Sequence, residues 1–297
     1  MNSLRFTKKR LSLFMLPFLF LCVNVSFPLT AARADDSNAP TGAFSTDILS
    51  QYIFRGVANS STGCVIQPSF TATWNGFSAN VWGNFDASRH SVNSYIPLQN
   101  GAEGNSKWSE TDFTVSYTKE LCKDFSVLIG NVYYGLQYPN AYGPNSNDED
   151  EVYGGVSYNF PWFSAAFTTY GEVMHSADEY FELDLSKAIP LPMLDCWCKG
   201  TTLNLGTSFG YLILNQDINT LKVTPFGTPP PTGSFSGFDT CFLNASVTFP
   251  INKYLSVSPK VGLWLPLTSK ASDYLQANSM DQRSTHFYGG INLTATF

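Results

Sequence analysis

The end of the chain, Ser284 to Phe297, is the stretch that most limits the fold. Counting back in twos from Phe297 gives a mostly apolar set of side chains, and the offset positions give a mostly polar set. A strand that crosses a membrane needs ~9 to 11 residues, whose side chains face lipid and lumen in turn. The stretch therefore predicts the last strand of a bacterial outer-membrane β-barrel.

The start of the chain predicts secretion. Residues 5–10 carry four basic side chains, an apolar run from Leu11 to Leu29 follows, and residues 32–34 read Ala-Arg-Ala. This order is typical of a signal peptide, here residues 1–34. The alternative is a single N-terminal membrane anchor, which Pro17 and Pro28 disfavour because they interrupt the apolar run.

Net charge limits the partners. The whole chain is at −6, and removal of residues 1–34 takes away five of its 17 basic residues and none of its 23 acidic ones, leaving a charge near −11. Nucleic-acid binding needs clustered lysine and arginine, so a nucleic-acid partner is not expected. The expected partners are outer-membrane lipid, the barrel-assembly machinery and small solutes.

The remaining chain is predicted to be one all-β domain. We expect a short periplasmic segment at residues 35–42 and then, over residues 43–297, an antiparallel up-and-down transmembrane barrel of about 12 strands. Tight turns alternate with long loops, expected near residues 88–107, 140–150, 214–237 and 268–283. An even strand number, short periplasmic turns and long external loops are typical of such barrels. A soluble sandwich or lipocalin-like barrel is the less favoured alternative.

Individual segments show the pattern clearly. Val65–Trp74 and Phe77–Asp86 flank Asn75-Gly76, the strongest hairpin signal in the chain. Ala43 to Arg55 is predicted as one continuous first strand that carries Tyr52 and Phe54 on its outward side.

The first strands also resemble a known family. The block at residues 50–57 and the segment at residues 77–86 resemble the opening of the TorF-type porins, which implies an outer-membrane barrel with channel activity. Gln51 and Phe77 depart from that pattern, and the aromatic Phe297 resembles the C-terminal signature read by the barrel-assembly machinery. The matching residues are Tyr52, Phe54, Arg55, Gly56, Trp82 and Gly83.

The inward positions predict the lining of a lumen. An excess of carboxylates there favours cations or neutral polar solutes, because charged rings act on a partly dehydrated ion at short range. The alternative is that these charges pair and fill the barrel, since twelve strands lie between filled and open sizes; we favour a narrow pore. The lumen candidates are Asp47, Gln51, Arg55, Trp82, Asn84, Asp86, Asp112, Glu151, Glu172, Glu182, Asp184, Lys260, Trp264, His286 and Tyr288.

Catalysis and cofactors are not expected. Outer-membrane enzymes that use a nucleophile need a histidine beside a serine or carboxylate. After residue 34 the chain has His90, His175 and His286, and no spacing singles out a triad. The sequence therefore predicts neither an enzyme nor a cofactor or metal site.

The cysteines predict an oxidising compartment and a possible cross-link. Five remain after residue 34, an odd number, so at least one is free or paired between chains. Cys122 and the pair Cys196 and Cys198 are expected at periplasmic turns, where Cys122 is a disulfide candidate for either member of the pair. The alternative function is a non-conducting structural barrel, disulfide-linked to a periplasmic partner or a second copy.

Overall fold

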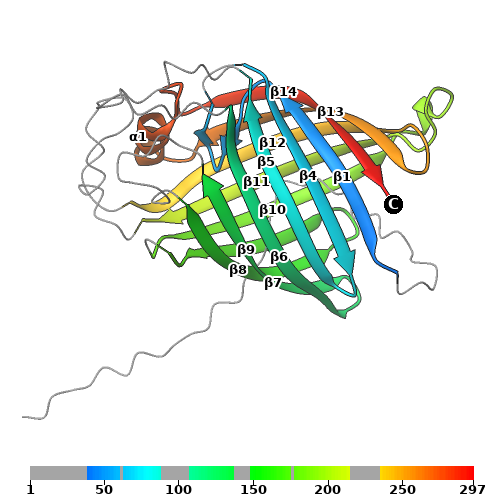
Figure 1. The fold of residues 1–297 in the computed structure, drawn as a ribbon, viewed down its shortest axis with the longest axis horizontal. Helices are drawn as coiled ribbons and strands as arrows, with labels where there is room; N and C mark the ends of the chain where they lie inside the picture. Colours follow the sequence, from blue (N-terminus) through cyan, green and yellow to red (C-terminus); the bar gives the residue numbers. More distant parts are fainter. Residues whose placement is uncertain (1–38, 61–62, 88–106, 137–147, 175–176, 215–234) are drawn as a thin grey trace, which may run out of the picture.

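Twelve antiparallel strands close into a barrel (Figure 1). The computed structural model describes residues 39–60, 63–87, 107–136, 148–174, 177–214 and 235–297; the predicted signal peptide and most of the predicted long loops lie outside these residues. The predicted strand number and architecture are confirmed. The wall consists of β1 (Thr41–Leu49), β4 (Val65–Trp74), β5 (Phe77–Asp86), β6 (Trp108–Cys122), β7 (Phe125–Leu136), β8 (Glu149–Asn159), β9 (Ser164–Glu172), β10 (Glu179–Pro190), β11 (Thr202–Ile213), β12 (Ser236–Pro250), β13 (Leu255–Pro266) and β14 (His286–Thr296).

The barrel closes between its first and last strands. β1 pairs with β14 from Ala43 and Thr296 to Leu49 and Gly290. Tight turns and the start of β1 lie at the same end as the C-terminus (Figure 1). One of them is the predicted Asn75-Gly76 turn, whose residues have φ of 49° and 85°. Short turns face the periplasm in single-chain outer-membrane barrels, so we expect this turn end on the periplasmic side.

The outer surface is apolar. Val81, Ile129 and Leu293 point outward and are 42%, 57% and 40% exposed. Aromatic side chains, including Trp74 and Phe297, gather at the turn end. This distribution fits a lipid environment, where apolar side chains stay out of water. The closed barrel also leaves no strand edge unpaired in the membrane.

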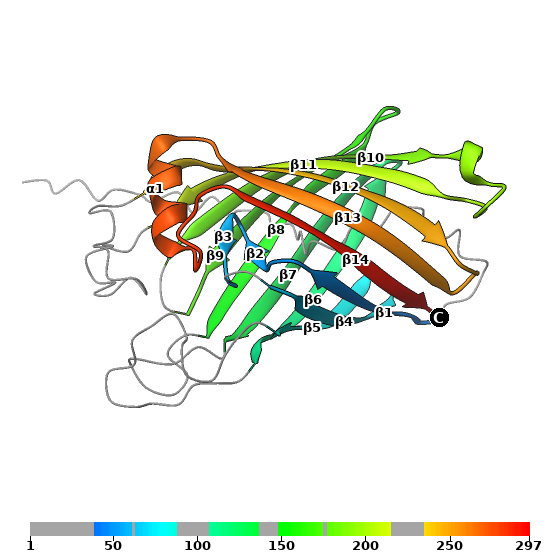
Figure 2. The same ribbon diagram turned by 90° about the horizontal axis from the view of Figure 1, so that it is seen from above.

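The predicted first strand is wrong in its second half. β1 ends at Leu49, and the chain then folds into the barrel as a small hairpin of β2 (Ile53–Phe54) and β3 (Val57–Ala58), which Figure 2 shows inside the ring of strands. We call residues 51–60 the inner hairpin. Arg55 and Gly56 form its turn with φ of 46° and 82°, values that two-residue hairpin turns require.

This fold explains why alternation failed there. The side chain of Tyr52, predicted to face outward, is 6% exposed, and its ring centroid lies 5.5 Å from that of Trp82. A hairpin folded into a lumen buries apolar side chains as effectively as a strand facing lipid. Alternation alone therefore does not distinguish the two.

A helix covers the inner hairpin at the loop end, within the stretch predicted as loop at residues 268–283. α1 (Ser269–Asn278) begins after Thr268, whose Oγ1 accepts a hydrogen bond from Ala271 N at 3.1 Å, and it buries Leu275. Apolar positions at i and i+4 on one face account for this helix. Among the described residues no helix is long and apolar enough to span a membrane.

Hydrogen bonds fasten the segment after α1 to the inner hairpin. Ala58 N donates to Ser279 Oγ at 3.1 Å, and Gln51 Nε2 donates to Asp281 Oδ2 at 2.9 Å. Burial raises the pKa of Asp281, but hydrogen bonds from His286 and Gln51 outweigh it, so the pKa of this carboxyl lies below its usual range. Asp281 therefore stays ionised near neutral pH and holds the hairpin to the segment after α1.

Replacing Gly56 with alanine is expected to loosen the inner hairpin. The φ of +82° costs an L-residue about 1–2 kcal/mol, and the new Cβ would lie 2.5 Å from Thr240 Cγ2. We expect hydrogen exchange of the hairpin amides in detergent micelles to speed up about tenfold, because local opening follows local stability. Gly237→Ala is the control, since a Cβ there meets nothing within 4 Å. Equal exchange in both variants would contradict a strained turn.

Candidate functional site

A cavity of about 770 Å³ occupies the barrel interior. It begins at the turn end, where Thr41, Lys253 and Phe297 line it, and it reaches the inner hairpin, where Tyr52 and Arg55 line it. The cavity therefore connects the expected periplasmic mouth with the hairpin.

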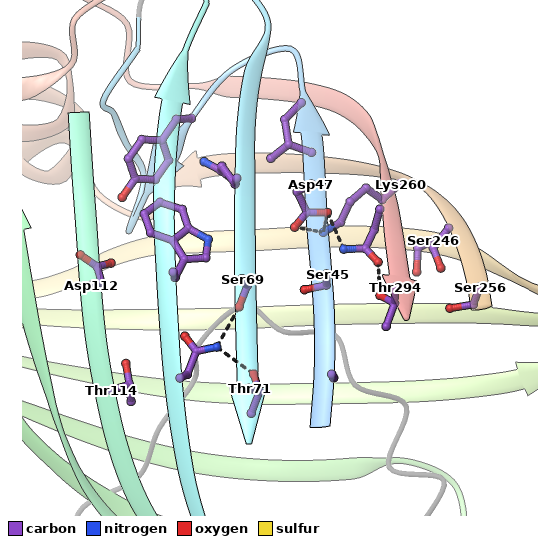
Figure 3. A pocket seen from close by; sticks show the side chains of 18 of the residues that line it. Ser45, Asp47, Ser69, Thr71, Asp112, Thr114, Ser246, Ser256, Lys260 and Thr294 are labelled. Carbon is purple, nitrogen blue, oxygen red and sulfur yellow. Dashed lines mark hydrogen bonds and ion pairs between the residues drawn. The ribbon is translucent and has the colours of Figure 1, made fainter. Parts of the chain in front are cut away.

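Hydroxyl and amide side chains form much of the wall near the turn end. They come from inward positions of strands on opposite sides of the cavity (Figure 3). Asn80 Nδ2 donates to Ser69 Oγ and to Thr71 Oγ1, both at 2.8 Å. Such a wall offers donors and acceptors to hydrated solutes and suits a water-filled passage. The labelled members are Ser45, Ser69, Thr71, Thr114, Ser246, Ser256 and Thr294.

One ion pair lies on this wall. Lys260 Nζ on β13 lies 3.0 and 3.1 Å from the two oxygens of Asp47 on β1, and Asn292 Nδ2 on β14 donates to Asp47 Oδ1 at 3.0 Å (Figure 3). The pair spans three neighbouring strands, since β14 lies between β1 and β13. Asp47 is thereby neutralised at this depth of the lumen.

Replacing Lys260 with glutamine is expected to increase cation preference. Asp47 would lose its cation but keep the Asn292 hydrogen bond. Because both side chains are partly exposed (15% and 17%), we expect at most ~1 kcal/mol, or roughly a fivefold rise in the cation-to-anion permeability ratio. Reversal potentials across a salt gradient measure this ratio, and Asp47→Asn should move it the opposite way. A shift of the same sign in both variants would contradict this role of the pair.

The inner hairpin places a cation inside the barrel, near its loop end. Arg55 Nη1 and Nη2 donate to Glu151 Oε1 and Oε2 at 2.6 and 2.8 Å. Its guanidinium carbon lies 4.4 Å from the ring centroids of both Tyr170 and Tyr180, and Tyr134 Oη donates to Glu151 Oε2 at 2.9 Å. We call these five residues the Arg55 cluster. Only the predicted strand is wrong at Arg55, which sits at the tip of the hairpin and not in the wall. Arg55 lines the lumen cavity as predicted and also pairs with a carboxylate.

Buried carboxyl groups surround this cluster. Glu110, Asp112 and Asp239 are 3%, 9% and 1% exposed. Glu110 Oε2, Asp112 Oδ1 and Asp239 Oδ1 have no hydrogen-bond partner among the described residues. Glu182 lines the same cavity at 8% exposure. Acidic side chains thus gather around the guanidinium that the hairpin brings in. The cavity lining as a whole is balanced, with Asp47, Asp112 and Glu182 against Arg55, Lys253 and Lys260.

Several members were missed by sequence reasoning. Glu110 has the same alternation parity as Asp112, so the pattern could have found it. Tyr170 and Tyr180 have the same parity as Glu172 and Glu182, so alternation places them in the lumen too. Nothing in the sequence pairs them with Arg55, because that contact depends on a hairpin folded against them.

The structure separates the predicted lumen residues into two groups. Asn84, Asp86 and His286 are buried at the loop end, where His286 Nε2 lies 3.2 Å from Ser279 Oγ, so His286 packs against the segment after α1. Asp184 accepts a hydrogen bond from Ser208. Glu172 on β9 lies opposite Glu151 on β8 in the strand register, and Glu151 belongs to the Arg55 cluster. The cavity is lined by Asp47, Gln51, Arg55, Trp82, Asp112, Glu182, Lys260, Trp264 and Tyr288.

The predicted bridge from Cys122 is not formed. Cys122, Cys196 and Cys198 are free thiols in the structure, as are Cys64 and Cys241. Strands β7, β8 and β9 stand between Cys122 at the end of β6 and the connection after β10 that carries the pair. Neighbouring strands are ~4.8 Å apart, whereas a disulfide needs Cα atoms within ~7 Å.

No metal site is found in the part of the chain that the structure describes, where no group of three or more His, Cys, Asp or Glu side chains could hold an ion.

A closed even-stranded barrel with an apolar exterior and a polar lumen defines a bacterial outer-membrane protein. The chain belongs to the family described as "Bacterial protein of unknown function (Gcw_chp)", whose model matches residues 34–205. No curated protein sequence matches it significantly.

Solved structures similar to the chain include outer-membrane barrels. A KdgM porin is 11% identical with a TM-score of 0.46, over 86% of this chain and 99% of the porin. A bacterial polysaccharide outer-membrane secretin is 8% identical with a TM-score of 0.43, over 88% and 99% of the two chains. An outer-membrane channel from Pseudomonas putida F1 is 7% identical with a TM-score of 0.41, over 87% and 94%.

Proposed function

We propose that the protein is a narrow porin-like channel for small polar or cationic solutes. The observation that carries this is the cavity between the turn-end mouth and the inner hairpin, whose lining includes hydroxyl, amide and charged side chains. The carboxyl groups of Asp112 and Glu182 line the cavity beside the Arg55 cluster, and side chains of this kind can hold a partly dehydrated cation at short range. The resemblance of the first strands to TorF-type porins supports the same activity. In this proposal solutes pass through the barrel, and no reaction is catalysed.

In this proposal the inner hairpin is the barrier. It carries Arg55 into the acidic part of the lumen, where the cation pairs with Glu151 and fills the space between two tyrosine rings. Passage then requires the hairpin to move away from the wall. The described conformation corresponds to a closed or low-conductance state.

Planar bilayer recording tests the channel directly. Purified protein should give discrete conductance steps in potassium chloride, and reversal potentials in a salt gradient should show cation preference. Absence of steps in both the wild-type chain and a chain with a loosened hairpin, such as Gly56→Ala, would contradict channel activity.

A structural envelope barrel is the second candidate. It is favoured by the exposed thiols of Cys122 and Cys196 near the turn end. Electrophoresis of native envelopes without reductant should then show a cross-linked species that disappears with reductant and in a Cys122→Ser, Cys196→Ser, Cys198→Ser variant. A monomer in both lanes would exclude the cross-link.

A further inference from the structure

The carboxylate and the two tyrosine rings that hold the Arg55 guanidinium belong to the barrel wall, and the ring of Phe54 on the hairpin itself lies 4.8 Å from the guanidinium carbon. Glu151 lies on β8, Tyr170 on β9 and Tyr180 on β10, three consecutive strands of the closed sheet. Tyr134 on β7 donates to Glu151, so a second wall residue orients the carboxylate, and Phe54 of the hairpin packs against the Tyr134 ring at 5.7 Å. Because the hydrogen-bonded strands of the wall hold Glu151, Tyr134, Tyr170 and Tyr180, we expect these groups to stay in place when the hairpin moves away.

The seat has the chemistry of a guanidinium site. Glu151 offers two oxygens to two guanidinium nitrogens, at 2.6 and 2.8 Å, and a planar fork meets a carboxylate in this bidentate manner. The rings of Tyr170 and Tyr180 both lie 4.4 Å from the guanidinium carbon, within cation–π distance. An alkylammonium is a point charge that makes no such fork, so the seat discriminates between the two cations.

The cavity reaches this seat, although Glu151 and Tyr180 are buried and do not line it, so a solute can contact them only after Arg55 leaves. Arg55, Tyr134 and Tyr170 line the cavity, together with Asp112 and Glu182. Asp112 is 9% exposed and its carboxyl group lines the same cavity, so it can meet a second donor group of a solute. A solute with a guanidinium at one end and an amine at the other would satisfy both sites, whereas a solute carboxylate would be repelled.

We propose that the lumen contains a binding site for small guanidino compounds, preferably guanidinoalkylamines without a carboxylate, which Arg55 occupies in the described conformation. Such a solute competes with Arg55 for Glu151 and therefore favours release of the inner hairpin, since a ligand shifts a population by its differential affinity. Solute binding and gating are then linked. This second statement rests on the proposed function, but the binding site itself does not.

Binding to purified barrels in detergent micelles tests the site without any need for conduction. Agmatine should bind the Arg55→Ala barrel roughly tenfold or more tightly than 1,5-diaminopentane, an amine of similar length that lacks the fork, and more tightly than arginine. The wild-type barrel should bind agmatine more weakly than Arg55→Ala, because Arg55 must first leave. Titration calorimetry gives all these affinities.

The double variant Arg55→Ala, Glu151→Gln is the matched control, and it should lose the preference for agmatine. If Arg55→Ala does not fold, Arg55→Lys provides the same comparison, because a lysine leaves the fork unmatched. Equal affinities for agmatine and the diamine, or a preference that survives Glu151→Gln, would overturn the site.

Bilayer recordings separate this inference from the channel itself. If agmatine binds but no variant conducts, the site stands and the channel proposal fails. If Arg55→Ala conducts and agmatine neither binds nor blocks it, the channel stands and the guanidinium site is wrong.

Discussion

Replacing Arg55 with alanine is expected to give the largest functional change, a clear rise in single-channel conductance or open probability. The change removes two charge-assisted hydrogen bonds to Glu151 and the ring contacts with Tyr170 and Tyr180. Breaking a buried ion pair costs about 3–5 kcal/mol; we use the lower figure because the Arg55 side chain is 19% exposed. About 3 kcal/mol shifts the equilibrium toward the released hairpin by roughly 100-fold.

Planar bilayer recording in symmetric potassium chloride measures this change. Arg283→Ala removes the same side chain from an exposed position after α1 and should leave conductance unchanged. The exchanged pair Arg55→Glu, Glu151→Arg should recover part of the closure by restoring opposite charges. A wild-type conductance in Arg55→Ala would contradict the barrier role of the inner hairpin.

Replacing Val81 with arginine is expected to give the largest loss of stability. Val81 lies near the middle of β5 and is 42% exposed, paired with Phe70 and Phe113 of the neighbouring strands, which also point outward. An arginine at the bilayer midplane costs about 2–4 kcal/mol in a transmembrane barrel, because its charge leaves water for hydrocarbon. Reversible unfolding in guanidinium chloride from phospholipid vesicles measures this cost.

The matched control is Leu121→Arg. Leu121 is 55% exposed and lies at the turn end of β6, beside the β6–β7 turn. The same arginine should cost only about 0–1 kcal/mol there, because the side chain reaches the interface. Equal costs at the two positions would contradict the membrane orientation derived from the apolar exterior.

Alternation was sufficient to predict the barrel wall. The predicted bounds of Val65–Trp74 and Phe77–Asp86 coincide with β4 and β5, and the closing strand pairs with β1 as expected. Asp47, Asp112 and Lys260 were predicted at inward-facing positions, and all three line the same cavity. Each of these predictions rests on a local rule, that successive side chains of a strand point to opposite faces.

Predictions that needed long-range contacts failed. Alternation continues from Gln51 to Arg55, so the sequence predicts these residues as part of the first strand of the wall. The stretch after Thr268 appeared as loop because α1 is short and is stabilised by burial of Leu275 against other elements. The Cys122 bridge depended on which turns are neighbours around the ring, and strand order alone decides that.

An acidic, twelve-stranded barrel with polar inward positions follows from the sequence alone, because two-residue periodicity and turn residues are properties of short stretches. That the lumen holds its own cation is visible only in the folded chain. Arg55 meets Glu151 across 96 residues of sequence, and Tyr170 and Tyr180 become ring partners only after the hairpin folds inward. No local pattern encodes that meeting, since it depends on the closure of the whole ring.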